Sequence, residues 1–108
     1  MKPGVVLINT SRGEVVDLNA LEDGLRSGRI GAAGLDVMPT EPPDRPHPLV
    51  KAWTDREPWL EGRLLVTPHT AFFSPESVLD LRRLALKTVL DYPATGAPRA
   101  CVNRRELT

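Results

Sequence analysis

The sequence is poor in several features that would point to particular classes of protein. Cys101 is its one cysteine among 108 residues, so no disulfide can form within the chain, and this scarcity fits a reducing, cytoplasmic compartment. The 14 lysines and arginines balance the 14 aspartates and glutamates, so no net charge attracts nucleic acid, an acidic substrate or an anionic membrane. The early apolar run at residues 5–8 is far shorter than the ~20 residues of a membrane-spanning helix. No histidine or cysteine cluster has the spacing of a metal site. We therefore expect a small protein that holds no metal and binds neither nucleic acid nor a membrane. Its partners should bind at a local site.

Three short apolar runs predict the strands of a parallel sheet, at residues 5–9, 30–37 and 64–67. The first is rich in β-branched residues and has no polar alternation, which is typical of a strand covered on both faces. The second contains small residues that allow a helix or a cofactor to approach the backbone closely. Short links on either side of one helix favour a right-handed crossover between parallel strands, so the sequence predicts an α/β fold.

Two helices are predicted from their capping residues. Asp17 is a good N-cap and Gly28 a good stop for a helix of about ten residues, whose apolar stripe consists of Leu18, Leu21 and Leu25. Ser74 begins a longer helix that we expect to reach about Tyr92 and to end at Pro93. Apolar residues lie almost all round this second helix, which predicts more burial than a surface helix has.

The segment 39–62 has prolines, charges and two tryptophans but no sustained periodicity. Apart from a short helical turn near residues 49–53, we expect a long loop, and loops of this length inside compact domains are usually functional.

Polar residues follow the three expected strands at the end where α/β sheets bind ligands, namely Arg12, Asp36 and His69. The fork of donors on Arg12 can hold a carboxylate and an adjacent carbonyl together, although an arginine after a strand more often makes a surface ion pair. His69 has the chemistry of a proton shuttle, although a histidine after proline is more often structural. His47, between two prolines, keeps that structural interpretation.

Three blocks of sequence, in order, resemble the NAD-dependent D-isomer-specific 2-hydroxyacid dehydrogenases. They are Ile-Asn-Thr-Ser-Arg-Gly at 8–13 followed by Val-Val-Asp at 15–17, Gly-Leu-Asp-Val at 34–37 with Pro-Thr-Glu-Pro at 39–42, and Thr-Pro-His at 67–69. The resemblance implies the second half of a Rossmann-like doubly wound parallel sheet with a long C-terminal helix. Residues 1–92 would be the C-terminal half of a dinucleotide-binding domain, and residues 93–108 a tail that in relatives returns to the substrate lobe.

The same resemblance implies roles for single residues. Arg12 would anchor a small 2-hydroxy or 2-oxo acid, His69 would move the proton, and Glu41 would pair with His69 to fix its tautomer. Asp36 would accept a hydrogen bond from the nicotinamide carboxamide, although turn capping is its ordinary role. The cofactor would be NAD, with NADP not separated from it, and further contacts would come from Thr10, Ser11, Arg12, His69 and Ala71.

Two departures from the family pattern leave a second function open. No Gly-x-Gly-x-x-Gly occurs in the sequence, which puts NAD binding by this chain alone in doubt and predicts weak turnover or none. Phe72 and Phe73 follow His69 where most of the dehydrogenases have glycine, and this bulk resembles the C-terminal-binding-protein branch of corepressors. The alternative is therefore a non-enzymatic, NAD-linked interaction module or a truncated remnant. Because half a sheet leaves an unpaired edge, we expect a homo-oligomer or pairing with a longer homologue.

Overall fold

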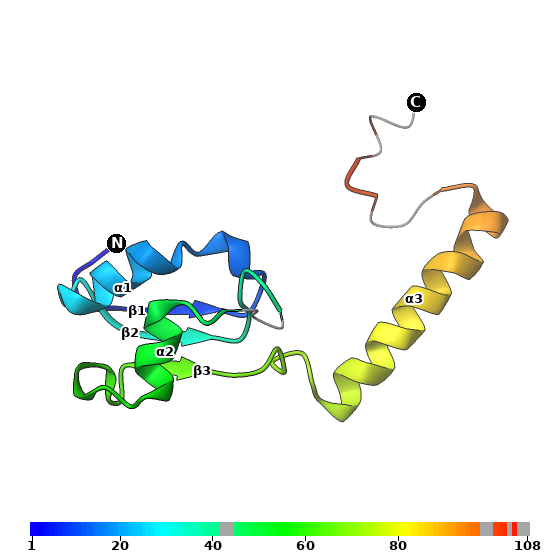
Figure 1. Ribbon diagram of the computed structural model, residues 1–108. Helices are drawn as coiled ribbons and strands as arrows, with labels where there is room; N and C mark the ends of the chain where they lie inside the picture. Colours follow the sequence, from blue (N-terminus) through cyan, green and yellow to red (C-terminus); the bar gives the residue numbers. More distant parts are fainter. Residues whose placement is uncertain (42–44, 98–100, 104, 106–108) are drawn as a thin grey trace. The chain divides into compact units, whose positions relative to one another are not determined.

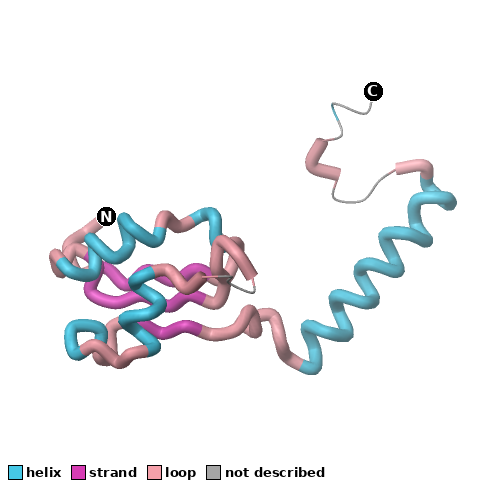
Figure 2. The backbone as a smooth tube through the Cα atoms, viewed as in Figure 1, coloured by secondary structure: helices cyan, strands magenta, loops and turns pink. Residues whose placement is uncertain are grey.

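The computed structural model describes residues 1–41, 45–97, 101–103 and 105, in two compact units, Met1–Ala71 and Phe72–Thr108. The first unit contains three strands and two α-helices, and the second contains one long helix (Figures 1 and 2). In chain order the elements are β1 (Val5–Asn9), the 3-10 helix η1 (Gly13–Val15), α1 (Leu18–Arg26), β2 (Ile30–Leu35), α2 (Pro48–Thr54), the 3-10 helix η2 (Pro58–Leu60), β3 (Leu64–Val66) and α3 (Pro75–Thr95).

The three strands form one parallel sheet in the order β1-β2-β3, which confirms the predicted α/β class. Asn9 pairs with Leu35 and Leu35 pairs with Val66, so the carboxyl ends of all three strands lie at one edge. The second and third strands end at Leu35 and Val66, slightly earlier than predicted, and the side chains of the residues that follow, Asp36 and Thr67, are hydrogen-bonded to each other. This edge is where the polar residues that follow the strands collect.

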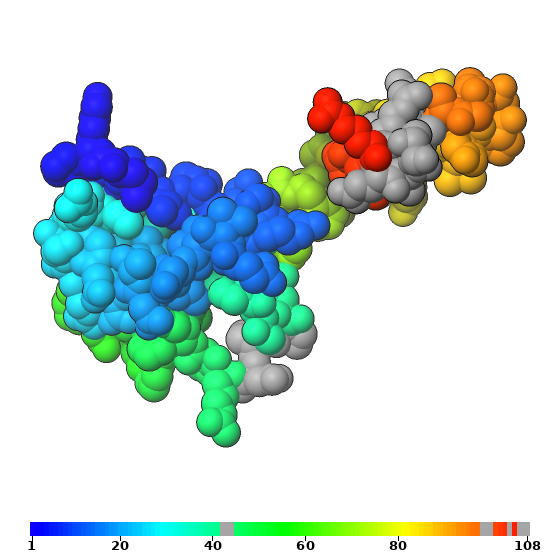
Figure 3. Space-filling model, turned by 90° about the horizontal axis from the view of Figure 1, so that it is seen from above, coloured from blue at the N-terminus to red at the C-terminus, as the bar shows by residue number. Residues whose placement is uncertain are grey.

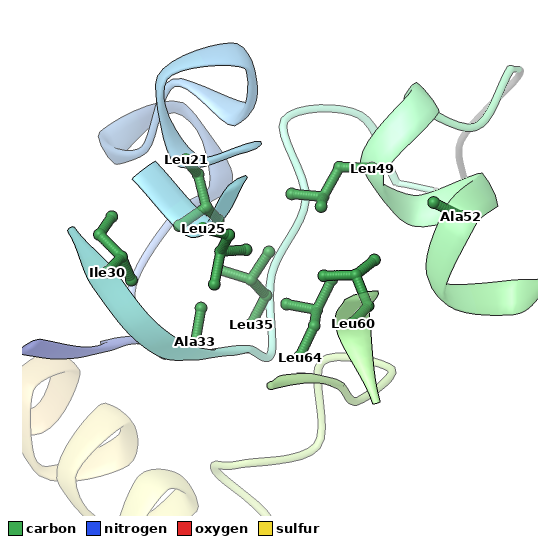
Figure 4. Packing of buried hydrophobic residues seen from close by; sticks show 9 residues of the cluster. All are labelled: Leu21, Leu25, Ile30, Ala33, Leu35, Leu49, Ala52, Leu60 and Leu64. Carbon is green, nitrogen blue, oxygen red and sulfur yellow. The ribbon is translucent and has the colours of Figure 1, made fainter. Parts of the chain in front are cut away.

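Helices α1 and α2 cover one face of this sheet, and the hydrophobic core lies between these helices and the sheet. Asp17 caps α1 by accepting hydrogen bonds from two backbone N–H groups, and Gly28 follows it with φ +73°, as predicted. The buried side chains point toward one another from several elements (Figure 4), and they are Leu21, Leu25, Ile30, Ala33, Leu35, Leu49, Ala52, Leu60 and Leu64. The predicted short helical turn near residues 49–53 is confirmed as α2, but the segment 39–62 also contains η2 and supplies three of these core residues, which the prediction of a loop missed. Its apolar pieces are too short, and too interrupted by prolines, to show a period.

Arg63 connects the core elements through their backbone. Its guanidinium is partly buried and donates hydrogen bonds to four carbonyl oxygens, those of Leu25 (2.6 Å), Gly31 (2.9 Å), Ile30 (3.1 Å) and Trp59 (3.3 Å). One arginine thereby satisfies acceptors at the end of α1, at the start of β2 and in η2.

The other face of the sheet is uncovered in the first unit. Val6, Ile8 and Leu65 point to this face and are 60–65% exposed. The prediction that β1 is covered on both faces was therefore wrong, because both α-helices of the unit pack on the opposite face. An apolar strand sequence indicates that both faces of the strand are suited to burial, but it does not indicate which elements pack on them.

Helix α3 departs from prediction in two ways. It continues through Pro93 to Thr95 and ends at Gly96, whose φ of +65° supplies the left-handed stop. Pro93 cannot donate the backbone hydrogen bond that its position would give to the carbonyl four residues earlier, and α3 nevertheless continues for two further residues. Within the second unit no residue of α3 is buried, against the expectation of more burial than a surface helix has. None of the described helices is long and apolar enough to span a membrane.

Candidate active site

One cavity of about 330 Å³ is lined by Arg12, Glu41 and His69 together. Arg12 follows β1 and His69 follows β3, while Glu41 lies in the segment after β2. The three side chains are far apart in sequence and meet because parallel strands present their carboxyl ends at one edge. The sequence predicted that they would gather there, and their chemical roles stay predictions at this point.

Asn9 shapes the loop that carries Arg12. This asparagine is only 5% exposed, and its Nδ2 donates to the Arg12 carbonyl at 2.8 Å. Its Oδ1 accepts from both the backbone N–H and the hydroxyl of Ser11, at 3.1 and 3.0 Å. This structural role of Asn9 was not predicted from the sequence, although a polar residue that ends an apolar strand was a usable signal.

The loop that carries Arg12 belongs to the N-terminal part of the first unit, which is drawn in blue in Figure 3. The Arg12 side chain is exposed. Its Nη1 donates to the Ser11 carbonyl at 2.6 Å, and it forms no ion pair with any described carboxylate. The surface ion pair that is the ordinary role of such an arginine is therefore not what fixes it here. Its guanidinium can instead receive a carboxylate from a ligand.

Gly13 brings the Arg12 loop against the segment that carries Glu41. A Cβ at this position would lie 1.9 Å from the carbonyl carbon of Met38 and 2.2 Å from the nitrogen of Pro39. No side chain fits between two backbones in such contact. The glycine of the Arg-Gly pair is thus a packing requirement of the cavity.

Glu41 and His69 form a direct pair. His69 Nδ1 and Glu41 Oε2 are 2.6 Å apart, and Glu41 Oε1 accepts the backbone N–H of Met38, also at 2.6 Å. The Met38 N–H, followed by the hydrogen bond with His69, lowers the pKa of Glu41 below its ordinary value. An ionised Glu41 favours a proton on Nδ1, which leaves Nε2 as the nitrogen for proton exchange.

Asp36 is buried at the end of β2, with 4% of its surface exposed. Its Oδ1 accepts from the Thr67 hydroxyl at 2.5 Å and from the backbone N–H of Thr70 at 2.9 Å, and its Oδ2 accepts from that of Ala71 at 2.9 Å. The hydrogen bond from Thr67 is the largest influence that lowers the pKa of Asp36. This carboxylate therefore remains charged inside the fold.

The residues expected near the cofactor lie along this edge of the sheet. Thr10, Ser11 and Ala71 are exposed there, and Asp36 lies beneath them with acceptor capacity left on Oδ2. Exposed polar backbone beyond the carboxyl ends of parallel strands fits the nicotinamide end of a dinucleotide. The phosphate-binding glycine loop does not occur in this sequence, so the fit extends to that end alone.

His47 takes a structural position, as predicted. Its Nδ1 accepts the backbone N–H of Leu49 at the start of α2, and its Nε2 lies 3.1 Å from Asn19 Oδ1. The part of the chain that the structure describes contains no group of three or more histidines, cysteines and carboxylates placed to hold a metal ion.

A second cavity of about 420 Å³ also borders the Glu41–His69 pair. It is lined by side chains of the α2 and β3 region, among them Val50, Trp53 and Val66. This cavity was not predicted from the sequence, because the α2 side chains that line it, Val50 and Trp53, showed no sustained periodicity.

Residues 1–71 match the sequence model of the D-isomer specific 2-hydroxyacid dehydrogenase, NAD binding domain. The chain is similar to a hydroxypyruvate reductase of Blautia hydrogenotrophica, with 35% identity over 104 residues that cover 96% of this chain and 29% of the relative. It is also similar to the D-3-phosphoglycerate dehydrogenase of Escherichia coli strain K12, with 33% identity over 108 residues that cover 100% of this chain and 25% of the relative.

Solved structures have the same arrangement of elements. A glyoxylate reductase from Paecilomyes thermophila superposes with a TM-score of 0.68 at 30% identity, over 97% of this chain and 29% of that one. The chain thus spans between 25% and 29% of the length of these three proteins.

Proposed function

Because this chain belongs to the D-isomer specific 2-hydroxyacid dehydrogenase family, we propose that it contributes part of the active site of an oxidoreductase that acts on the CH–OH group of small D-2-hydroxy acids. The observation that carries the proposal is the single cavity lined by Arg12, Glu41 and His69. A cation for the carboxylate and a proton donor for the oxygen are the two groups that such a substrate requires.

Arg12, His69 and Glu41 have different roles in the proposed reaction. Arg12 binds the carboxylate of the substrate and orients the adjacent carbon. In the reductive direction, His69 donates the Nε2 proton to the carbonyl oxygen of the 2-oxo acid, and in the oxidative direction the same nitrogen takes the hydroxyl proton. Glu41, held ionised by the Met38 N–H, stabilises the charged imidazole through Nδ1. NAD, when bound, supplies or accepts the hydride.

NAD is the cofactor supported by the matched NAD-binding family model. In this chain we assign its nicotinamide end to Thr10, Ser11, Asp36 and Ala71. Because the sequence has no Gly-x-Gly-x-x-Gly, the grip on the phosphates must come from other residues, and we expect turnover by this chain alone to be slow or absent.

Oxidation of NADH at 340 nm with glyoxylate, pyruvate or hydroxypyruvate tests this function. We expect slow, substrate-dependent oxidation at most, lost in Arg12→Gln and His69→Ala. His47→Asn is the matched control, because asparagine also caps α2 and His47 lies outside the cavity of Arg12. Turnover at the rate of a complete enzyme would contradict the view that the site is incomplete, and turnover that survives His69→Ala would contradict the assigned proton donor.

A second candidate function is self-association, which the uncovered sheet face supports. Val6 and Ile8 of the edge strand β1 and Leu65 of β3 form an exposed apolar surface, and a second copy of the chain would cover this surface and the edge of β1. Light scattering coupled to size-exclusion chromatography should find a dimer or larger species, and Ile8→Ser should weaken it while Val15→Ser, exposed outside the sheet, should not. A clean monomer at micromolar concentration would contradict this candidate.

A further inference from the structure

The segment 67–71 holds His69 in a backbone conformation that histidine rarely adopts. His69 has a φ of +53°, in the left-handed region that favours glycine. A side chain with a Cβ is strained there, and such strain persists only when surrounding contacts fix the backbone. The contacts that fix this segment therefore decide where the imidazole lies.

Most of these contacts come from Asp36. Its carbonyl accepts the backbone N–H of His69 at 2.8 Å. Its carboxylate accepts from Thr67 at the start of the segment and from the consecutive N–H groups of Thr70 and Ala71 at its end. Consecutive backbone N–H groups that converge on one anion form a recognised anion-binding arrangement, occupied here by a carboxylate of the same chain.

Asp36 also connects the two loops of the cavity. Its own N–H donates to the Asn9 carbonyl at 3.0 Å, and the Asn9 side chain holds the Arg12 loop. The residue that fixes the His69 segment and the residue that fixes the Arg12 loop are therefore joined across neighbouring strands. A displacement of Asp36 would change the position of the imidazole relative to the guanidinium.

We propose that Asp36 is a positioning residue for His69, whose carboxylate and carbonyl hold the segment 67–71 so that the imidazole reaches Glu41. The importance of this position rests on the proposed function, since it matters for chemistry only if His69 moves a proton. In this role Asp36 acts through the backbone of the segment that carries His69, and its three side-chain hydrogen bonds still leave acceptor capacity on Oδ2 for a ligand.

The test is long-range ¹H–¹⁵N NMR of the His69 ring in the full 108-residue chain at about pH 9, where an imidazole is ordinarily neutral. A proton on Nδ1 indicates that His69 is hydrogen-bonded to the Glu41 carboxylate. The Glu41→Gln variant gives the reference ratio of the two protonated forms when that carboxylate is removed. In Asp36→Asn an amide group would face the Ala71 N–H, so one acceptor becomes a donor. We expect the ratio of Nδ1- to Nε2-protonated His69 to fall about fivefold or more, toward that of Glu41→Gln, an equilibrium shift of about 1 kcal/mol. Asp23→Asn, an exposed aspartate of α1, removes the same charge and should leave the ratio unchanged.

A folded Asp36→Asn chain with the wild-type ratio would overturn the proposal. If this variant does not fold, Thr67→Val decides, because it removes one hydrogen bond to Oδ1 and keeps the charge. An intermediate ratio in Thr67→Val supports the positioning role, and an unchanged ratio overturns it. The readout needs no substrate, cofactor or turnover, so the positioning role and the proposed oxidoreductase function can fail independently.

Discussion

Replacement of Gly13 by alanine should separate the two walls of the candidate active site. The added Cβ would lie 1.9 Å from the backbone of Met38, whereas real Cβ contacts are essentially never under 3.0 Å, so the two backbones must move apart by about 1 Å. Misplacement of a catalytic group by about 1 Å costs on the order of 100-fold in rate. Overpacking of this kind also destabilises a fold by about 1–3 kcal/mol.

Two measurements separate these effects. The midpoint temperature of thermal unfolding, followed by circular dichroism, should fall by about 4–8 °C for each kcal/mol of lost stability in a domain of this size. Glyoxylate, titrated by NMR, should bind about tenfold more weakly, which corresponds to the loss of one charge-assisted hydrogen bond. Gly4→Ala is the control, because Gly4 has φ +73° but nothing within 4 Å of its Cβ position. It should lose stability through strain and keep glyoxylate binding. Equal affinity in Gly13→Ala and wild type would refute the packing argument.

Three further changes test the fold and its electrostatics. Arg63→Ala removes the donors to four backbone carbonyls and should lower the free energy of unfolding by about 3–5 kcal/mol in urea denaturation, whereas Arg29→Ala, at an exposed position, should stay within about 0.5 kcal/mol. Leu49→Ala should cost about 2–5 kcal/mol because Leu49 is fully buried, and Leu65→Ala, exposed on the uncovered face, should cost much less. The pKa of Glu41 is lowered in the fold, chiefly by a backbone N–H, so its contribution to stability is present above the unfolded value of about 4.5 and disappears as pH falls through the lower folded value. Acid titration of stability below pH 4.5 should therefore be steeper for wild type than for Glu41→Gln, and parallel curves would contradict the lowered pKa of Glu41.

Local signals in the sequence were sufficient for much of the first unit. The apolar run of β1, the cap at Asp17 and the stop at Gly28 each act within a few residues, and the structure agrees with all three. Features that depend on distant partners were not predictable in this way. The burial of Leu49 and the exposure of Ile8 are set by which elements pack on which face of the sheet.

The candidate site shows the same division. Residue types and the order of the strands were enough to predict that Arg12 and His69 lie at one edge. The contacts that hold them there were not visible, because the N–H groups bound by Asp36 and the backbone touched by Gly13 belong to segments more than 20 residues away. A side chain that binds backbone leaves no pattern in the sequence of its partner.

Whether Arg12 and His69 form one binding site can be measured by an NMR titration of the chain with glyoxylate that follows two signals, the Arg12 Nε–H and the His69 Cε1–H. If guanidinium and imidazole line one cavity, a single ligand should shift both signals with the same dissociation constant, and Arg12→Gln should weaken the response at His69. A shift at only one of the two residues, or two different dissociation constants, would show that Arg12 and His69 do not belong to one site.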